Sequence, residues 1–287
     1  MLKSADNFCR QAVLYFIFIW FGLMVFAPNL LVLLASFLTR DPVWYLRLPL
    51  NLQNYAALGD PQLLSVILKS LNLAFCTTLF CLLVAYPFTY FIARFAKERR
   101  ALFLMLIIVP FWTNSLMRNY ALITILGENG ILNAFLLKHG VIDAPLKLLN
   151  TDLAVFVGMT YTLLPFMILP IYAVLDKIDR AVLEAAHDLG AGPYAAFFRV
   201  IVPVSAPGIV AGCIMVFLPA LTLFYVSDIL GGADSVVLGS VIRDRFMVVK
   251  DWPVGAAINV GLTVFMLFLL HLYYKSGNSV DQEQPIW

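Results

Sequence analysis

Six long stretches without charged residues alternate with short polar segments along the chain. The uncharged runs are 11–39, 70–93, 101–117, 153–175, 200–227 and 252–274. A helix that crosses a bilayer needs about 20 apolar residues, with a range of roughly 17–25, whereas membrane β-barrels show shorter segments of alternating character. We therefore predict an all-α integral membrane protein, a single transmembrane domain over 1–287, with six helices at about 11–38, 70–93, 101–125, 153–175, 204–228 and 253–274.

The first run resembles a signal peptide in one respect, since positively charged residues, Lys3 and Arg10, precede its apolar residues. The apolar part of a cleaved signal peptide has only about 7–15 residues. Since the run 11–39 is much longer, we expect a retained first helix.

The composition agrees with a membrane location and excludes several classes of protein. Hydrophobic residues make up 62% of the 287 residues and charged residues 13%, against roughly 45–50% and 25% in soluble domains. The mean hydropathy is +0.90. An ordinary cytosolic enzyme, a disordered chain and a nucleic-acid-binding protein are thereby excluded, and the net charge of +2 indicates no polyanionic partner. The four cysteines and three histidines lack metal-ligand spacing, so we expect no metal site.

The segment Arg94–Arg100 predicts the orientation in the membrane. It holds four cations in seven residues, and positively charged short loops stay on the cytoplasmic side. With six helices, both termini are then cytoplasmic, and so is the loop 176–203. The outward-facing loops are those at about 39–69, 126–151 and 229–251.

The loop 176–203 has the pattern of two short helices joined by a turn. Asp179 can cap a helix that begins at Arg180, and Gly190 can end it in the left-handed conformation. Gly192-Pro193 can then begin the second helix. In the first helix, an apolar stripe is predicted from Val182, Leu183, Ala186 and Leu189.

The spacing of Glu184-Ala185-Ala186, Gly190 and Pro203 resembles the EAA loop of permease subunits in binding-protein-dependent ABC importers. Val200 and Val202 stand where that family usually has Ile and Leu, and they keep the apolar character. The resemblance implies a type I ABC importer permease fold and a loop that inserts into a groove of a cytoplasmic ATPase. The ATPase-coupling residues that it implies are Glu184, Ala185, Ala186, Asp188, Gly190 and Pro203.

Two acidic residues of this loop fit a basic partner. Glu184 and Asp188 are like-charged neighbours at i and i+4, an arrangement that destabilises an isolated helix. It becomes favourable when a partner supplies cations.

The chain has no phosphate-binding G-x-x-x-x-G-K-[ST] motif and no Gly-Lys dipeptide. We therefore predict that it is not an enzyme, that it holds no cofactor, and that ATP and Mg are bound by a partner ATPase. Six helices leave little room for a complete gated pathway, so a second permease subunit is expected.

Further stretches resemble the PotB-type permeases of spermidine/putrescine importers over nearly the full length. They are Ser36–Asp41, Pro110–Leu116, Gly140–Asp143, Leu164–Met167, Phe224–Asp228 and Asp251–Pro253. The resemblance implies a location in the bacterial inner membrane. It also implies a complex with a homologous PotC-type permease, two copies of the ABC ATPase and a periplasmic polyamine-binding protein.

A path for a polyamine needs carboxylates and aromatic faces, since each cation–π contact contributes roughly 0.5–2 kcal/mol. Asp228 is the carboxylate that directly adjoins an aromatic cluster at a predicted helix end, and an ionisable residue near membrane depth is a functional candidate. The candidate path residues are Trp112, Tyr120, Tyr161, Tyr225 and Asp228. Packing, or a belt at the membrane interface, is the alternative role for each aromatic, and a surface salt bridge is the alternative for Asp228.

Arg118 complicates this interpretation, because a cation in or near the third helix repels a polyamine. We expect Arg118 to pair with a carboxylate such as Glu128 or Asp228, or to face lipid headgroups.

Three other functions compete with polyamine transport. A permease of the same fold could carry an amino acid, an osmolyte or an oxyanion, although an anion path should offer several inward cations. A secondary transporter often has inverted repeats and midplane charges, and neither is visible. A membrane enzyme would need a motif such as H-E-x-x-H or G-x-S-x-G, which the sequence lacks.

Overall fold

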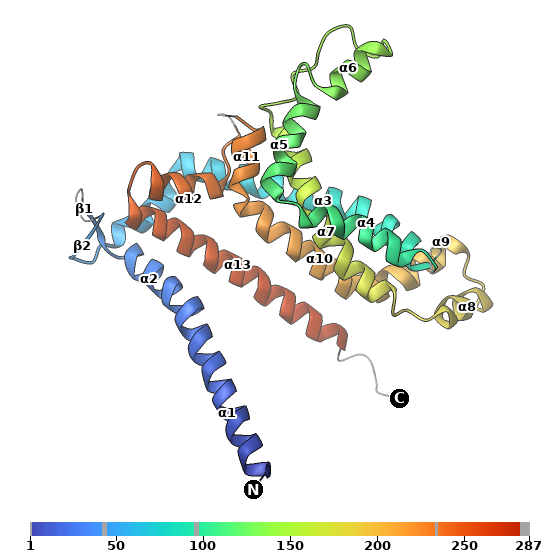
Figure 1. The fold of residues 1–287 in the computed structure, drawn as a ribbon, viewed down its shortest axis with the longest axis horizontal. Helices are drawn as coiled ribbons and strands as arrows, with labels where there is room; N and C mark the ends of the chain where they lie inside the picture. Colours follow the sequence, from blue (N-terminus) through green and yellow to red (C-terminus); the bar gives the residue numbers. More distant parts are fainter. Residues whose placement is uncertain (1, 42–44, 95–97, 233–234, 282–287) are drawn as a thin grey trace. The chain divides into compact units, whose positions relative to one another are not determined.

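The computed structural model describes residues 2–41, 45–94, 98–232 and 235–281, and these residues are largely helical (Figure 1). The α-helices are α1 (Leu2–Phe21), α2 (Ala27–Ser36), α3 (Pro61–Arg94), α4 (Arg100–Trp112), α5 (Ser115–Leu126), α6 (Ile131–Lys138), α7 (Asp152–Leu175), α8 (Arg180–Asp188), α9 (Pro193–Ala196), α10 (Val202–Thr222), α11 (Phe224–Leu230), α12 (Leu238–Met247) and α13 (Trp252–Asp281). The other elements are the π-helical turns Gly22–Phe26 and Phe197–Ile201, the 3₁₀-helix Leu52–Gly59, and strands β1 (Thr39–Asp41) and β2 (Tyr45–Arg47).

Within the described residues, six helical segments are long and apolar enough to cross a membrane, which confirms the predicted number. They are Val13–Ser36, Pro61–Arg94, Ser115–Lys138, Asp152–Leu175, Pro193–Thr222 and Trp252–Leu272. The chain divides into two compact units. The first unit is Met1–Leu64 with Val241–Leu267, and the second unit is Ser65–Ser240 with Phe268–Trp287.

Two of the predicted helices are interrupted. In place of one helix over 101–125, the chain forms α4 and α5, because Thr113 is extended and the Asn114 side chain caps α5 by accepting a hydrogen bond from a backbone amide. In place of one helix over 204–228, it forms α10 and α11, since Leu223 has a ψ of 64° that lies outside the helical region.

The first unit contains the hairpin and the 3₁₀-helix. β1 and β2 are antiparallel, with Thr39 opposite Arg47. Asn54 of the 3₁₀-helix donates hydrogen bonds to the carbonyl oxygens of Ser36 at 2.9 Å and Leu38 at 2.8 Å, and thereby ties this helix to the end of α2. The large apolar side chains of α1 and α2 are mostly exposed, as expected of a helix that meets lipid or another subunit.

The centre of the second unit is α7, which packs lengthwise against α10 (Figure 1). Fully buried side chains recur every fourth residue along α7, at Val155, Met159, Leu163, Met167, Ile171 and Leu175. Because a helical turn has about 3.6 residues, a spacing of four places them on a stripe that winds slowly around α7. This stripe belongs to the core against which the elements of the candidate site are positioned.

Two small residues allow α10 to approach α7 closely. A Cβ atom at Gly208 would lie 2.9 Å from the carbonyl oxygen of Pro170, and one at Gly212 would lie 2.8 Å from the sulfur of Met167. Gly208 and Gly212 form a G-x-x-x-G pattern, which serves the close packing of membrane helices.

Gly208→Ala is expected to destabilise the protein by about 1–3 kcal/mol, the usual cost of overpacking a core. The new methyl group would meet a backbone oxygen, which cannot rotate away. Thermal unfolding of the detergent-solubilised protein should therefore show a lower Tm. Gly22→Ala is the matched control, because nothing lies within 4 Å of its new Cβ atom. Equal Tm values for the two variants would contradict the close approach of α10 to α7.

Ionic contacts join two segments that are predicted to be cytoplasmic. Arg100 lies 2.7 Å from a carboxylate oxygen of Asp176, and Arg94 donates a hydrogen bond to the carbonyl oxygen of Ile178 at 3.1 Å. The positively charged end of α3 and the start of the loop 176–203 therefore lie at the same end of the second unit.

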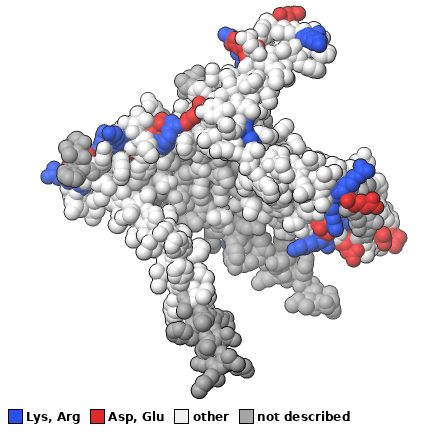
Figure 2. Space-filling view, in the orientation of Figure 1, with Lys and Arg blue, Asp and Glu red and all other residues white. Residues whose placement is uncertain are grey.

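Another ion pair marks the opposite end of α7, where Lys69 lies 3.0 Å from Asp152. Figure 2 shows charged side chains gathered over α6 and over α8 and α9, with an almost uncharged surface over α4 between them. This distribution fits an apolar middle layer between two polar ends.

Candidate functional site

The loop 176–203 forms the two helices that its sequence predicts. The Asp179 side chain accepts a hydrogen bond from the backbone amide of Ala181 at 3.2 Å and caps α8. Gly190 follows α8 with a φ of +81°, a conformation that favours glycine. α9 then begins at Pro193, with Gly192 as its N-cap. The predicted helix boundaries of this loop are therefore confirmed.

This loop presents acidic and apolar side chains outward. Of the predicted apolar stripe, Ala186 is buried, while Leu189 is 89% exposed. Tyr194 at the start of α9 is 82% exposed. The other predicted coupling residues are also exposed, namely Glu184, Ala185, Asp188, Gly190 and Pro203. Exposed apolar groups of this kind are typical of a surface that another protein covers.

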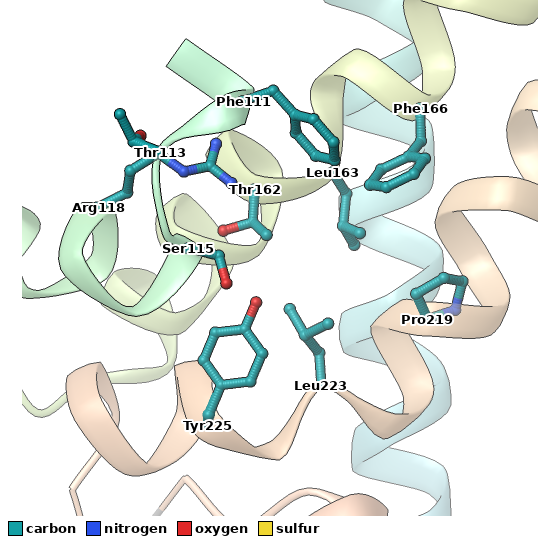
Figure 3. A pocket seen from close by; sticks show the side chains of 10 residues that line it. All are labelled: Phe111, Thr113, Ser115, Arg118, Thr162, Leu163, Phe166, Pro219, Leu223 and Tyr225. Carbon is teal, nitrogen blue, oxygen red and sulfur yellow. The ribbon is translucent and has the colours of Figure 1, made fainter. Parts of the chain in front are cut away.

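The break between α4 and α5 borders a cavity of about 340 Å³ in the second unit (Figure 3). Its lining residues come from the α4–α5 junction, from α7 and from the α10–α11 junction. They are Phe111, Thr113, Ser115, Arg118, Thr162, Leu163, Phe166, Pro219, Leu223 and Tyr225. In Figure 3, the hydroxyl groups of Ser115 and Tyr225 point toward one another. The cavity thus combines aromatic faces with several hydroxyl groups.

A second cavity, of about 250 Å³, shares Arg118 with the first. Tyr161 and the helix-interior prolines Pro110 and Pro165 line it together with aliphatic side chains. Arg118 therefore borders both cavities.

Arg118 is 9% exposed and lies against aromatic rings. Its guanidinium carbon is 5.4 Å from the ring centre of Phe111 and 5.5 Å from that of Tyr161. Among the described residues, its Nε has no hydrogen-bond partner and no carboxylate lies within ion-pair distance. The expected pairing with Glu128 or Asp228 is therefore wrong.

The structure brings two of the five candidate path residues to these cavities. Tyr225 lines the larger cavity and Tyr161 the smaller one. Trp112 is 80% exposed and Tyr120 is 55% exposed, and with Asp228 they line neither cavity.

Asp228 lies on α11 and is exposed. It accepts a hydrogen bond from the Ser240 hydroxyl at 3.4 Å.

The lining hydroxyl groups of Thr113, Ser115 and Thr162 are not among the path residues that the sequence predicts. Their positions within otherwise apolar runs are the signal that could have found them, because polar groups inside membranes tend to face other helices or cavities.

Solved structures define the class of this protein by its fold. A chain of the bacterial alginate ABC transporter, in complex with an alginate-pentasaccharide-bound periplasmic protein, superposes with a TM-score of 0.79 and 16% identity, covering 99% of this chain and 98% of that chain. A second structure of a bacterial ABC transporter, involved in the import of alginate, has a TM-score of 0.74 over 95% of this chain and 99% of that chain. The chain therefore shares the fold of a chain of these ABC transporters.

Sequence comparison gives the family within this class. PotB, the spermidine/putrescine transport system permease protein of Haemophilus influenzae, is 43% identical over 282 residues, which are 98% of this chain and 99% of that protein. The PotB protein of Escherichia coli K12 is 46% identical over 264 residues, 92% of this chain and 96% of its own. No protein-family model matches the chain. The chain belongs to the PotB family of permease proteins, as the sequence predicts.

Proposed function

We propose that this chain is the permease subunit of an ATP-driven importer that carries polyamines, such as spermidine and putrescine, across a bacterial inner membrane. The observation that carries the proposal is the 43–46% identity, over nearly the whole chain, to permeases named for spermidine/putrescine transport. In this proposal, both termini are cytoplasmic and a homologous PotC-type permease completes the path. A periplasmic binding protein delivers the polyamine.

The loop 176–203 supports a role in energy coupling. Its acidic and apolar residues are exposed and carried on a capped helix–turn–helix, so a cytoplasmic ATPase can dock there. Two copies of that ATPase bind ATP and Mg and hydrolyse the nucleotide. The loop then transmits their movement to α7 and α10, which border it along the chain.

The chemistry of the larger cavity supports a path for an aliphatic chain with ammonium groups. Phe111, Phe166 and Tyr225 offer aromatic faces, and Ser115 and Thr162 offer hydroxyl groups. Cation–π contacts of roughly 0.5–2 kcal/mol each hold an ammonium group without trapping it. Weak, repeated contacts of this kind suit passage better than one strong site does.

Uptake of radiolabelled spermidine tests the proposal. The chain is expressed with its partner subunits in cells that lack their own polyamine importers, and unlabelled putrescine, arginine and phosphate are tested as competitors. ATP-dependent uptake that putrescine alone competes is the expected result. If the assembled complex hydrolyses ATP but does not take up spermidine, the assignment of polyamines as the transported substrate is wrong. The assignment to the permease class would remain.

A further inference from the structure

Arg118 lies near the middle of the membrane layer. It contacts Tyr161, which is nine residues from Asp152 and fourteen from Leu175 along α7. At the helical rise these separations correspond to about 14 Å and about 21 Å. The ends of α7 carry ion pairs on both sides of this layer. A guanidinium at this depth is costly unless it has a partner.

The contacts within this chain leave the charge of Arg118 only partly compensated. The guanidinium makes cation–π contacts with Phe111 and Tyr161, but Nε remains without a hydrogen-bond partner among the described residues. A guanidinium has five N–H donors arranged in a planar fork that matches a carboxylate. In Figure 3 this fork points into the larger cavity, toward Thr162. An anion would satisfy this donor and compensate the charge at the same time.

No carboxylate among the described residues of this chain supplies that anion. Three described carboxylates were considered as partners of Arg118, and each lies elsewhere. Asp152 pairs with Lys69. Asp228 accepts a hydrogen bond from the Ser240 hydroxyl, and Glu128 is exposed. The proposed cargo is a cation, so it cannot serve. A lipid phosphate lies at the membrane surface, about 15 Å from the midplane of a bilayer whose core is about 30 Å thick.

The face that carries this cavity is suited to contact with another membrane subunit. Trp112 and Met117, which flank the cavity residues on α4 and α5, are 80% and 69% exposed in this chain. They are large apolar side chains, and aromatic residues and Met are enriched at protein interfaces.

We propose that Arg118 and the cavity around it form a binding site for a carboxylate side chain of the second permease subunit. The proposal rests on the proposed pairing of two permeases. The pair positions the two subunits against each other near the middle of the membrane. It also neutralises a positive charge that otherwise repels a polyamine, which reconciles Arg118 with a path for cations.

Arg118→Met tests the proposal by removing the charge and keeping much of the side-chain length. The readouts are co-purification of the partner permease from the full complex, ATP hydrolysis and spermidine uptake. Truncating one member of a buried charge pair leaves the other unpaired, so co-purification and uptake should each fall at least about tenfold. Lys138→Met is the control, because it removes one cation from an exposed position at the end of α6 and should change neither.

A second-site exchange keeps the test decisive if Arg118→Met assembles poorly. Each Asp and Glu in the membrane helices of the partner permease is changed to its amide, one at a time, in the Arg118→Met background. One such change should restore co-purification, since removing both charges of a buried pair is often nearly neutral. The same change beside wild-type Arg118 should impair assembly.

Two results would overturn the proposal. One is normal co-purification of the Arg118→Met chain. The other is a loss that no partner amide restores, which indicates a lipid or inorganic anion at this site. Co-purification does not depend on the transported substrate, so it tests the carboxylate pairing by itself. If the wild-type complex hydrolyses ATP and does not carry spermidine, only the assignment of the substrate is contradicted.

Discussion

Gly190→Arg is expected to reduce spermidine uptake at least tenfold while membrane insertion stays normal. Gly190 has a φ of +81°, which costs a residue with a side chain about 1–2 kcal/mol. Among the described residues, apart from its chain neighbours, nothing lies within 4 Å of a Cβ atom at this position, so the new side chain meets no obstacle at its base. It would instead project into the groove proposed to receive the loop. Uptake and ATP hydrolysis of the assembled complex, with immunoblots of membranes, measure the effect.

A second substitution at Gly190 separates the effect of backbone strain from the effect of side-chain size. Asn tolerates the left-handed conformation and is short, so Gly190→Asn should keep most of the uptake. Glu184→Lys leaves the backbone unchanged and reverses an exposed charge. It should uncouple ATP hydrolysis from uptake in the same way as Gly190→Arg. If both Gly190→Arg and Glu184→Lys couple ATP hydrolysis to uptake as the wild type does, the loop 176–203 is not the docking site of the ATPase.

The helix–turn–helix of the loop 176–203 could be predicted from the sequence because its geometry is local. A cap at Asp179, a left-handed glycine at Gly190 and a proline at the first position of α9 each act within a few residues. Their effects therefore do not depend on distant packing. The number of membrane-crossing helices could be predicted for a related reason, since the length of an uncharged run decides whether it can cross the bilayer.

The breaks within the predicted helices were missed because hydropathy does not report capping. The segment 101–125 remains apolar across Thr113 and Asn114, and only the extended conformation of the first and the side-chain cap of the second divide it. The same break places Arg118 beside Tyr161. An ion pair with a carboxylate such as Glu128 or Asp228 was expected, whereas Arg118 lies against Tyr161 of α7.

The cavity itself depends on contacts between distant segments. Ser115, Thr162 and Tyr225 come from three different helices, and no sequence spacing predicts their approach. Aromatic residues occur in most of the membrane helices, so residue type alone could not separate Tyr161 and Tyr225 from Trp112 and Tyr120. Packing makes that distinction.

Asp228→Asn is expected to raise the KM for spermidine uptake about tenfold, because a hydrogen bond to a charged group contributes roughly 1.5–3 kcal/mol. The carboxylate is exposed on α11, and Asn is close to it in shape and can still accept the hydrogen bond from Ser240. The hydrogen bond with Ser240 and the docking of the ATPase should therefore remain. The KM is measured with the assembled complex, together with its basal ATP hydrolysis.

Matched substitutions separate the charge of Asp228 from its structural contact. Asp228→Glu keeps the charge and should keep most of the affinity. Ser240→Ala removes the 3.4 Å hydrogen bond, keeps the carboxylate and should change the KM little. Glu128→Gln removes another exposed carboxylate of the second unit and should have no effect. If Asp228 contacts ammonium groups, raising the salt concentration should also weaken uptake in the wild type more than in Asp228→Asn, because salt screens exposed charges. A KM that stays unchanged in Asp228→Asn would remove this residue from the polyamine path and leave the aromatic and hydroxyl groups of the cavity as its remaining lining.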